Sequence, residues 1–141
     1  MAAATTIQLG DWETLGAAAS QIRRVVFIDE QHVPQEEEWD GRDADCLHFV
    51  ALLNDEPVGT ARLLPDGHIG RVAVLRSARG TGIGYQLMEA TIEAARSAGH
   101  THAALSAQLH ALAFYERLGF VAHGEVFMDA GIPHREMVRA L

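Results

Sequence analysis

Hydrophobic residues along the chain recur with a helical period in three segments. Over residues 12–31 and again over residues 82–98, apolar side chains return at steps of three and four, which predicts an amphipathic helix in each segment. A shorter helix is expected over residues 109–120. Gly99 and Gly119 stand where the second and third helices should end, because glycine readily adopts the left-handed conformation that closes a helix.

Between these helices the apolar residues form short runs separated by turn residues, which is typical of β-strands. The pair Asp66-Gly67 favours a tight hairpin between two of them. The expected strands are residues 5–10, 47–53, 58–64, 68–75 and 100–108, followed by two within residues 121–141 that join at a turn over residues 129–133. Because strands alternate with helices in the second half, we expect an α/β (α+β) fold with one mixed central sheet of six to seven strands and about four flanking helices.

The length of 141 residues suits one domain over residues 1–141, large enough to bury a core without a disulfide. Cys46 is the one cysteine, and the N-terminal segment lacks the basic and apolar regions of a signal peptide, so we expect a cytoplasmic protein. No run approaches the ~18 apolar residues of a membrane helix, so no membrane partner is expected. The histidines lack the spacing of metal ligands, and no metal site is expected.

Negative charge is concentrated in residues 29–45, called here the acidic segment. It holds eight acids and one base, whereas the net charge of the whole chain is -8. Pro34, Gly41 and the repulsion between like charges favour a loop. We weigh two interpretations: a solvated surface loop, or a lid that draws a cationic acceptor toward a site. The charge balance argues against nucleic acid as a partner, because phosphate contacts need clustered cations.

The run Arg79-Gly80-Thr81-Gly82-Ile83-Gly84 joins an expected strand to an expected helix. The first N–H groups of a helix have no partners within it and attract an anion, and glycines remove side chains that would block a bulky one. Arg76 and Arg79 add positive charge. The alternative is a turn that merely packs helix on strand. The Rossmann fingerprint fails because Tyr85 stands at its third glycine position, and a P-loop needs lysine, which the chain lacks.

The same run, following Val72-Ala73-Val74, resembles the acetyl-CoA signature of the GNAT superfamily of N-acetyltransferases. A second likeness runs from Gln108 to Phe120. The residues that fit that family's later motif are Ala111, Tyr115, Gly119 and Phe120, with Gln108 where asparagine is commoner. The segments RRVVFIDEQHVP and GIPHREM resemble the ElaA-type branch of the superfamily. The resemblance covers nearly the whole chain.

This resemblance implies a binding site for acetyl-CoA. The residues it assigns to that site are Val72, Ala73, Val74, Arg79, Gly80, Thr81, Gly82, Ile83, Gly84, Tyr85, Gln108, Ala111, Phe114 and Tyr115. The pyrophosphate would lie on the glycine run, and the pantetheine arm would pair with the exposed edge of the strand at residues 72–74. The fourth and fifth strands must then be splayed, and we expect a bulge near Ala73 or Val74 to part them.

The resemblance also implies transfer of the acetyl group to a primary amine, by direct attack in a ternary complex because nothing near Cys46 favours a thiolate nucleophile. Tyr115 is expected to be the general acid for the departing thiolate; the alternative is a half-buried core aromatic. Glu30 and His32, where the first helix gives way to the acidic segment, are expected to act as base or to bind the acceptor. Also considered as the base are His110, Glu125, His134 and a water relay.

The acceptor stays open between a small-molecule amine and a peptide amine. If the acidic segment is a lid, the acceptor is cationic: a polyamine, an amino sugar, an aminoacyl group or a lysine-bearing peptide. A rival from another class is a catalytically silent CoA-binding sensor or interaction module, and a third is a protein that binds ATP on the glycine loop. A homodimer through the final strands or a sheet edge is also left open.

Overall fold

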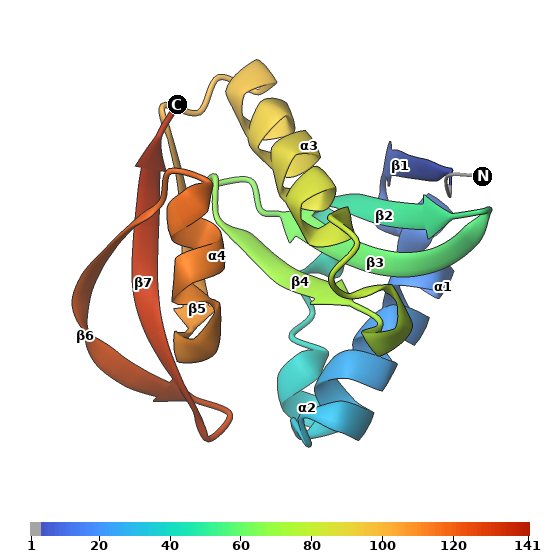
Figure 1. Ribbon diagram of the computed structural model, residues 1–141, viewed down its shortest axis with the longest axis horizontal. Helices are drawn as coiled ribbons and strands as arrows, with labels where there is room; N and C mark the ends of the chain where they lie inside the picture. Colours follow the sequence, from blue (N-terminus) through green and yellow to red (C-terminus); the bar gives the residue numbers. More distant parts are fainter. Residues whose placement is uncertain (1–3) are drawn as a thin grey trace.

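Seven strands form two antiparallel sheets that lie side by side in the computed structural model, which describes residues 4–141 (Figure 1). The first sheet has the order β1-β2-β3-β4 and the second the order β5-β7-β6. The strands are β1 (Thr5–Gly10), β2 (Leu47–Leu53), β3 (Glu56–Leu63), β4 (Ile69–Val74), β5 (His102–Gln108), β6 (Val121–Asp129) and β7 (Ile132–Ala140). Within the described residues, one parallel bridge, between His68 and Ala104, joins the two sheets.

The predicted splay of the fourth and fifth strands is confirmed, and it is wide enough to divide the expected mixed sheet into two. A β-bulge interrupts the pairing of β3 with β4: residues 60–62 of β3 lie opposite residues 70–73 of β4, so β4 has one residue more than β3 in this stretch. Within this bulge Arg71 has the left-handed backbone conformation, with φ 51°. The bulge therefore spans residues 70–73 and adjoins Ala73, which confirms the expectation of a bulge near Ala73 or Val74.

Three of the α-helices lie within the segments predicted to be helical, and a fourth lies in the acidic segment. They are α1 (Trp12–Arg23), α2 (Gln35–Glu38), α3 (Ile83–Ser97) and α4 (Leu112–Arg117), with a π-helix η1 (Arg24–Glu30) and short 3-10 turns η2 (Asp43–Asp45), η3 (Arg76–Ala78) and η4 (Leu109–Ala111). The helix expected over residues 12–31 is α-helical only as far as Arg23, and η1 continues it. π-helical turns are rare in proteins, and many of those that occur lie at functional sites.

The sheet of β1 to β4 carries α3 on one face and α1 on the other (Figure 1). Alternation along β2 produces these two layers: Phe49 packs in the core under α3, whereas Val50 packs with α1. Gly59 permits the close approach of α3, because a Cβ at this position would lie 2.8 Å from Cδ1 of Leu87. In residues 4–141, none of the helices is both long enough and apolar enough to cross a membrane.

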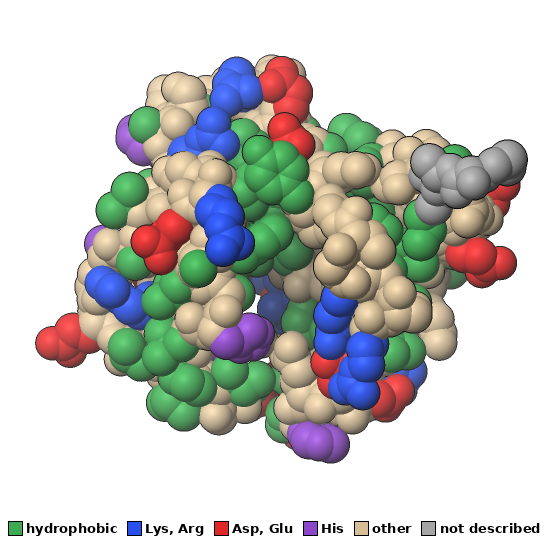
Figure 2. All heavy atoms as spheres, viewed as in Figure 1, with side chains coloured by type: hydrophobic (Ala, Val, Ile, Leu, Met, Phe, Trp, Pro, Cys, Tyr) green, Lys and Arg blue, Asp and Glu red, His purple; other side chains and the backbone are tan. Residues whose placement is uncertain are grey.

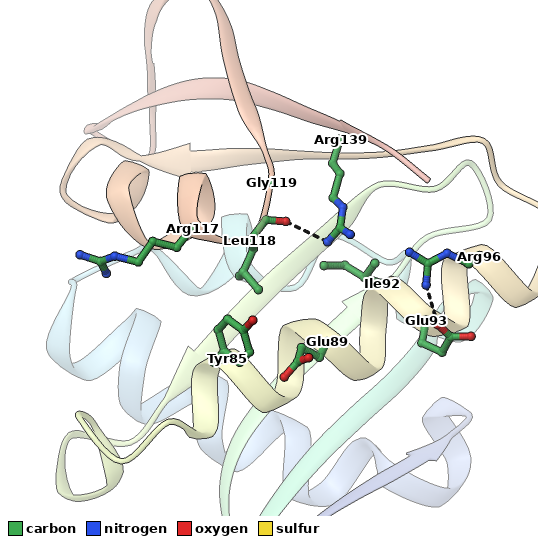
Figure 3. Close-up of a pocket in the computed structure, with 9 residues that line it drawn as sticks. All are labelled: Tyr85, Glu89, Ile92, Glu93, Arg96, Arg117, Leu118, Gly119 and Arg139. Atoms are coloured by element: carbon green, nitrogen blue, oxygen red, sulfur yellow. Dashed lines mark hydrogen bonds and ion pairs between the residues drawn. The ribbon is translucent and has the colours of Figure 1, made fainter.

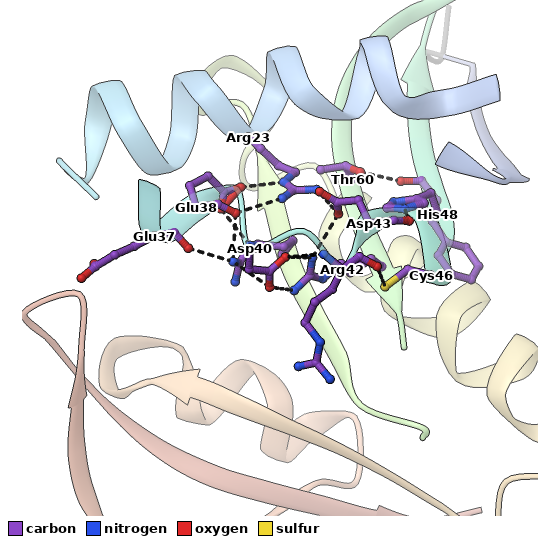
Figure 4. Close-up of polar contacts among 12 residues, drawn as sticks. Arg23, Glu37, Glu38, Asp40, Arg42, Asp43, Cys46, His48 and Thr60 are labelled. Carbon is purple, nitrogen blue, oxygen red and sulfur yellow. Dashed lines mark hydrogen bonds and ion pairs between the residues drawn. The ribbon is translucent and has the colours of Figure 1, made fainter. Parts of the chain in front are cut away.

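The acidic segment contains α2 and η2 and is therefore not the loop that its composition predicts. Arg23 of α1 pairs with Glu38 at 2.6 Å and with Asp43 at 2.7 Å, and these side chains are buried (Figure 4). Arg62 of β3 pairs with Asp43 at 3.0 Å and with Asp40 at 2.6 Å. Two arginines from the core thus fasten the acidic segment to α1 and β3.

These contacts determine the charge of the acids. Hydrogen bonds from Arg62 hold the pKa of Asp40 well below its usual range. Burial opposes ionisation of Asp43, but the hydrogen bonds from Arg23 and Arg62 outweigh it and lower the pKa of that carboxyl. Both expectations for this segment, a solvated loop and a lid for cations, are wrong for Glu38 and Asp43, because these two side chains are buried and compensated by arginine.

Candidate functional site

A cleft of about 1100 Å³ opens where β4 and β5 part. The space-filling view shows the surface hollowed near the centre of the face that carries α3 and α4 (Figure 2). Its walls come from η1, the edge of β4, β5, the residues around α4 and the turn between β6 and β7. Because parted strands leave backbone N–H and C=O groups without sheet partners, these edges can pair with an extended, amide-bearing ligand.

The glycine loop lies between η3 and α3. Gly80 and Gly82 adopt φ 78° and 85°, and no atom lies within 4 Å of the place where a Cβ would stand on either. Gly82 is the N-cap of α3, with no side-chain cap and no acid in the first turn. The first N–H groups of this long helix are therefore available to an anion, and the helix dipole favours negative charge there. Since Arg79 lines the cleft, these residues fit a diphosphate at its end.

Half of the residues predicted to bind acetyl-CoA line the cleft: Val72, Ala73, Val74, Arg79, Gln108, Ala111 and Tyr115. Gly80, Thr81, Gly82 and Ile83 continue from Arg79 into the start of α3, and Ile83 is buried in the core. A Cβ at Gly84 would lie 3.4 Å from the ring of Phe114, which packs edge-on against Tyr115 at 5.0 Å between ring centroids. Phe114 thus fixes the position of α4 relative to α3.

Tyr85 does not line this cleft. It belongs to a second hollow of about 410 Å³ beside α3 and the end of α4, which Arg117 and Arg139 also line (Figure 3). Arg139 donates a hydrogen bond to the carbonyl of Leu118 at 2.8 Å. The structure therefore separates Tyr85 from the predicted acetyl-CoA residues that line the cleft.

Glu30 and Arg79 meet at the mouth of the cleft. Nη1 and Nη2 of Arg79 donate to the Glu30 carboxylate at 2.7 and 2.8 Å, and Nε donates to the carbonyl of Val74 at 3.0 Å. Arg76 approaches the same carboxylate at 3.8 Å. The hydrogen bonds from Arg79 lower the pKa of Glu30, and the pairing raises the pKa of Arg79. In this arrangement Glu30 is a weak proton acceptor.

Tyr115 lies on the inner wall of the cleft and is 9% exposed. Its ring packs edge-on against Phe114 and Phe120. Burial raises the pKa of Tyr115 to about 12. The phenol therefore remains protonated near neutral pH and can donate a hydrogen bond to a group in the cleft. Tyr115 is thus both a core aromatic and a residue of the cleft wall. Its position is compatible with both roles considered from the sequence, a general acid and a core aromatic.

The five side chains considered as the base fall into different places. Of these, Glu30, His110 and His134 line the cleft, whereas His32 and Glu125 do not. His32 is exposed, with φ 59°, just after η1, and Glu125 is exposed on β6. His110 lines the cleft but its side chain is exposed, while His134 is buried. Among these five candidates, geometry thus leaves two histidines at the cleft, with Glu30 engaged by Arg79; His68, not considered as the base, also lines it.

Two features of the cleft were not expected from the sequence: Arg71, and the contact of Gln31 with Gln108, a residue already assigned to the acetyl-CoA site. At the bulge, Nε of Arg71 lies 2.8 Å from Glu38, and Nη2 donates to the carbonyl of that residue at 3.0 Å. Across the cleft, Nε2 of Gln108 donates to Oε1 of Gln31 at 2.9 Å and so joins η1 to β5. A lone arginine inside an apolar strand is a signal that could have drawn attention to Arg71. Two glutamines 77 residues apart give no such signal.

The fold and the cleft are those of a class of α/β proteins whose central sheet is split next to a helix that begins at a glycine-rich loop. Residues 16–141 match the family model described as an acetyltransferase (GNAT) domain. The chain is 37% identical over 135 residues to the protein ElaA of Escherichia coli, covering 86% of this chain and 85% of ElaA. The crystal structure of ElaA superimposes with a TM-score of 0.86, covering 95% of this chain and 99% of that one, at 35% identity.

Two further crystal structures agree. A putative N-acetyltransferase from Lactobacillus plantarum has a TM-score of 0.90 at 33% identity, covering 98% of this chain and 99% of that one. An acyl-CoA N-acyltransferase from Pseudomonas aeruginosa has a TM-score of 0.84 at 37% identity, covering 96% and 99%. The chain therefore belongs to the GNAT family of acetyltransferases. The similarity to ElaA confirms the predicted branch.

Proposed function

We propose that this protein transfers an acetyl group from acetyl-CoA to a primary amine, by direct attack within a ternary complex. The observation that carries the proposal is the parted edge of β4 and β5 beside the uncapped start of α3. An extended arm that bears amides and ends in a diphosphate matches these two features together. The similarity to an acyl-CoA N-acyltransferase from Pseudomonas aeruginosa supports the choice of an acyl-CoA donor.

The roles of the residues follow from their positions. The glycine loop and the first turn of α3 hold the diphosphate through backbone N–H groups. The free edges of β4 and β5 bind the amides of the arm, which places the thioester near Tyr115. The Tyr115 hydroxyl donates a hydrogen bond to the sulfur as the carbon–sulfur bond breaks, because its raised pKa keeps it protonated.

An acetylated cysteine has no part in the proposal. Cys46 is buried, and its thiol donates to the carbonyl of Arg42 at 3.3 Å. Burial raises the pKa of Cys46, so little thiolate forms near neutral pH. The amine therefore attacks the thioester directly. We propose a small-molecule or peptide amine as the acceptor, in a cytoplasmic setting, with neither nucleic acid nor membrane as partner.

The test measures free thiol released from acetyl-CoA in the presence of spermidine, glucosamine and a lysine-containing peptide. We expect release that depends on an amine, and a fall in kcat of about 10²-fold in Tyr115→Phe. The rise in Tm produced by CoA should be the same in both proteins, since a ligand that binds only the folded state raises its Tm. A Tm rise with CoA but no thiol release from any acceptor would instead support the catalytically silent CoA-binding module.

A further inference from the structure

His134 lies on β7 at the point where that strand faces both of its neighbours. Its register partners are Gln108 of β5 and Phe127 of β6. The imidazole stacks on the ring of Phe127, with 5.8 Å between centroids and 24° between planes. The side chain is 8% exposed and lines the cleft between β4 and β5. The ring is therefore held in one orientation at the wall of the proposed active site.

A hydrogen bond fixes the tautomer of this ring. Nδ1 of His134 lies 2.6 Å from the carbonyl oxygen of Ile132. A carbonyl oxygen can only accept, so Nδ1 must carry the hydrogen. In the neutral ring the lone pair then resides on Nε2. Among residues 4–141, no group makes a hydrogen bond with Nε2, so this atom is free to accept a proton on a residue that lines the cleft.

A second buried histidine shows what a purely structural role looks like in the same fold. His48 packs against Trp12, with 4.8 Å between ring centroids, and its Nε2 bonds the carbonyl of Asp43 at 2.8 Å. It lies in the core beside the ion pairs of the acidic segment and does not line the cleft. Each imidazole makes a hydrogen bond at one ring nitrogen, but His134 borders the cleft, whereas His48 lies in the core.

We propose that His134 is the group that takes the proton from the acceptor amine; this rests on the proposed acetyl transfer. Nε2 removes the proton from nitrogen as the nitrogen–carbon bond forms and the carbon–sulfur bond breaks. The Tyr115 hydroxyl gives its proton to the sulfur, so that the amide and free thiol are the products. The imidazolium then returns a proton to the phenolate through solvent, which restores both residues. An acceptor that arrives as an ammonium first loses one proton to Nε2, which passes it to solvent.

Few titratable groups surround His134. On the neighbouring elements, the titratable residues that line the same cleft are Asp129 of β6, His110 of η4 and Tyr115 of α4. The titratable residue of β5, His102, does not line it. On β7 itself, Glu136 accepts a hydrogen bond from the hydroxyl of Ser106. Two other imidazoles line the cleft, His110 and His68. His68 pairs with Asp66 and bridges to Ala104, away from the Gln108 end of β5 that pairs with His134. The test must therefore separate His134 from His110.

The test compares His134→Asn with His110→Asn and His123→Asn. The amide of the first variant can still donate to the Ile132 carbonyl, but it offers no basic nitrogen. His123 is exposed on β6 and does not line the cleft, so its variant is the matched control. With the three amines named above, we expect kcat of His134→Asn to fall about 10²-fold while the KM for acetyl-CoA and the CoA-induced rise in Tm stay unchanged.

The pH profile and the tautomer provide independent readouts. The wild-type rate should decline at low pH, because protonation removes the lone pair of Nε2, and this decline should disappear from the residual activity of His134→Asn. Long-range proton–nitrogen NMR should show the hydrogen on Nδ1 in the neutral ring of His134. Three outcomes would overturn the assignment of His134 but leave the proposed acetyl transfer intact. They are a wild-type rate in His134→Asn, an equal loss of rate in His110→Asn, and a hydrogen on Nε2 in the neutral ring. Absence of thiol release from the wild-type protein would contradict the proposed function itself.

Discussion

Glu30 and Arg79 lie 49 residues apart and form a two-pronged ion pair at the entrance of the cleft, with nitrogen–oxygen distances of 2.7 and 2.8 Å. One partner ends the π-helix η1, and the other begins the glycine loop. The sequence analysis assigns Arg79 to the pyrophosphate and Glu30 to the base or to acceptor binding. If Arg79 binds the diphosphate of acetyl-CoA, as we propose, that diphosphate has to compete with the Glu30 carboxylate for the same guanidinium.

Glu30→Gln should therefore strengthen CoA binding. The pair is partly exposed, with Arg79 39% and Glu30 24% accessible, so its removal should change Kd by about two- to five-fold. Arg79→Gln should weaken binding. The matched control is Glu93→Gln, which removes an exposed partner of Arg96 on α3, outside the cleft, and should leave Kd unchanged. Calorimetric titration with CoA checks all three variants; a weaker Kd in Glu30→Gln would show that Glu30 positions the arginine rather than competes for it.

Arg23→Met should destabilise the protein strongly. The guanidinium is 1% exposed, pairs with Glu38 and Asp43, and stacks on Trp12 and Trp39 at 5.5 and 5.0 Å. Removing it leaves Arg71 as the partner of Glu38 and Arg62 as the partner of Asp43, so that one buried negative charge is no longer compensated. We expect this to cost about 3 kcal/mol in free energy of unfolding.

Urea denaturation measures this effect. The control is Arg96→Met, which breaks an exposed pair with Glu93 and should change the free energy of unfolding by no more than ~0.5 kcal/mol. Similar losses in Arg23→Met and Arg96→Met would contradict the importance of the buried pairs.

Acid should weaken the attachment of the acidic segment. The pKa of Asp40 is held below the ordinary value of 3.8 by its hydrogen bond from Arg62. A carboxyl with a lowered pKa stabilises the fold above its ordinary pKa, and this contribution is lost as pH falls through the lowered value. Asp40→Asn should therefore be less stable than wild type at pH 7, and the gap should shrink progressively below about pH 4. Urea denaturation midpoints of both proteins, measured at pH 7 and below about pH 4, check this. A stability difference that does not change with pH would argue against the ion pair.

Local features of the fold follow from the sequence. Gly99 and Gly119 have positive φ just beyond the ends of α3 and α4, as their positions in the pattern predict. The hairpin at Asp66-Gly67 and the parted fourth and fifth strands also agree with the sequence analysis. These features depend on residues close together along the chain or on signatures that come with the family.

The remaining features depend on contacts between distant residues. Arg62 and Asp40 are 22 residues apart, and charge counting along the chain shows eight acids in one segment without showing that arginines elsewhere neutralise them. The left-handed backbone of Arg71 inside the bulge could not be predicted from residue type, because a positive φ is uncommon outside glycine. His134 could be considered as a base from its residue type alone, but only the structure shows that the Ile132 carbonyl fixes its tautomer.

The central claim is that acetyl-CoA lies between β4 and β5 with its diphosphate on the glycine loop. Amide hydrogen exchange, measured with and without CoA, tests it most directly. The account predicts increased protection at residues 72–74 of β4 and residues 80–86 at the start of α3, with little change along β1 and β2. Protection confined to the hollow beside Tyr85, Arg117 and Arg139, or no change on either edge of the cleft at saturating CoA, would contradict the account.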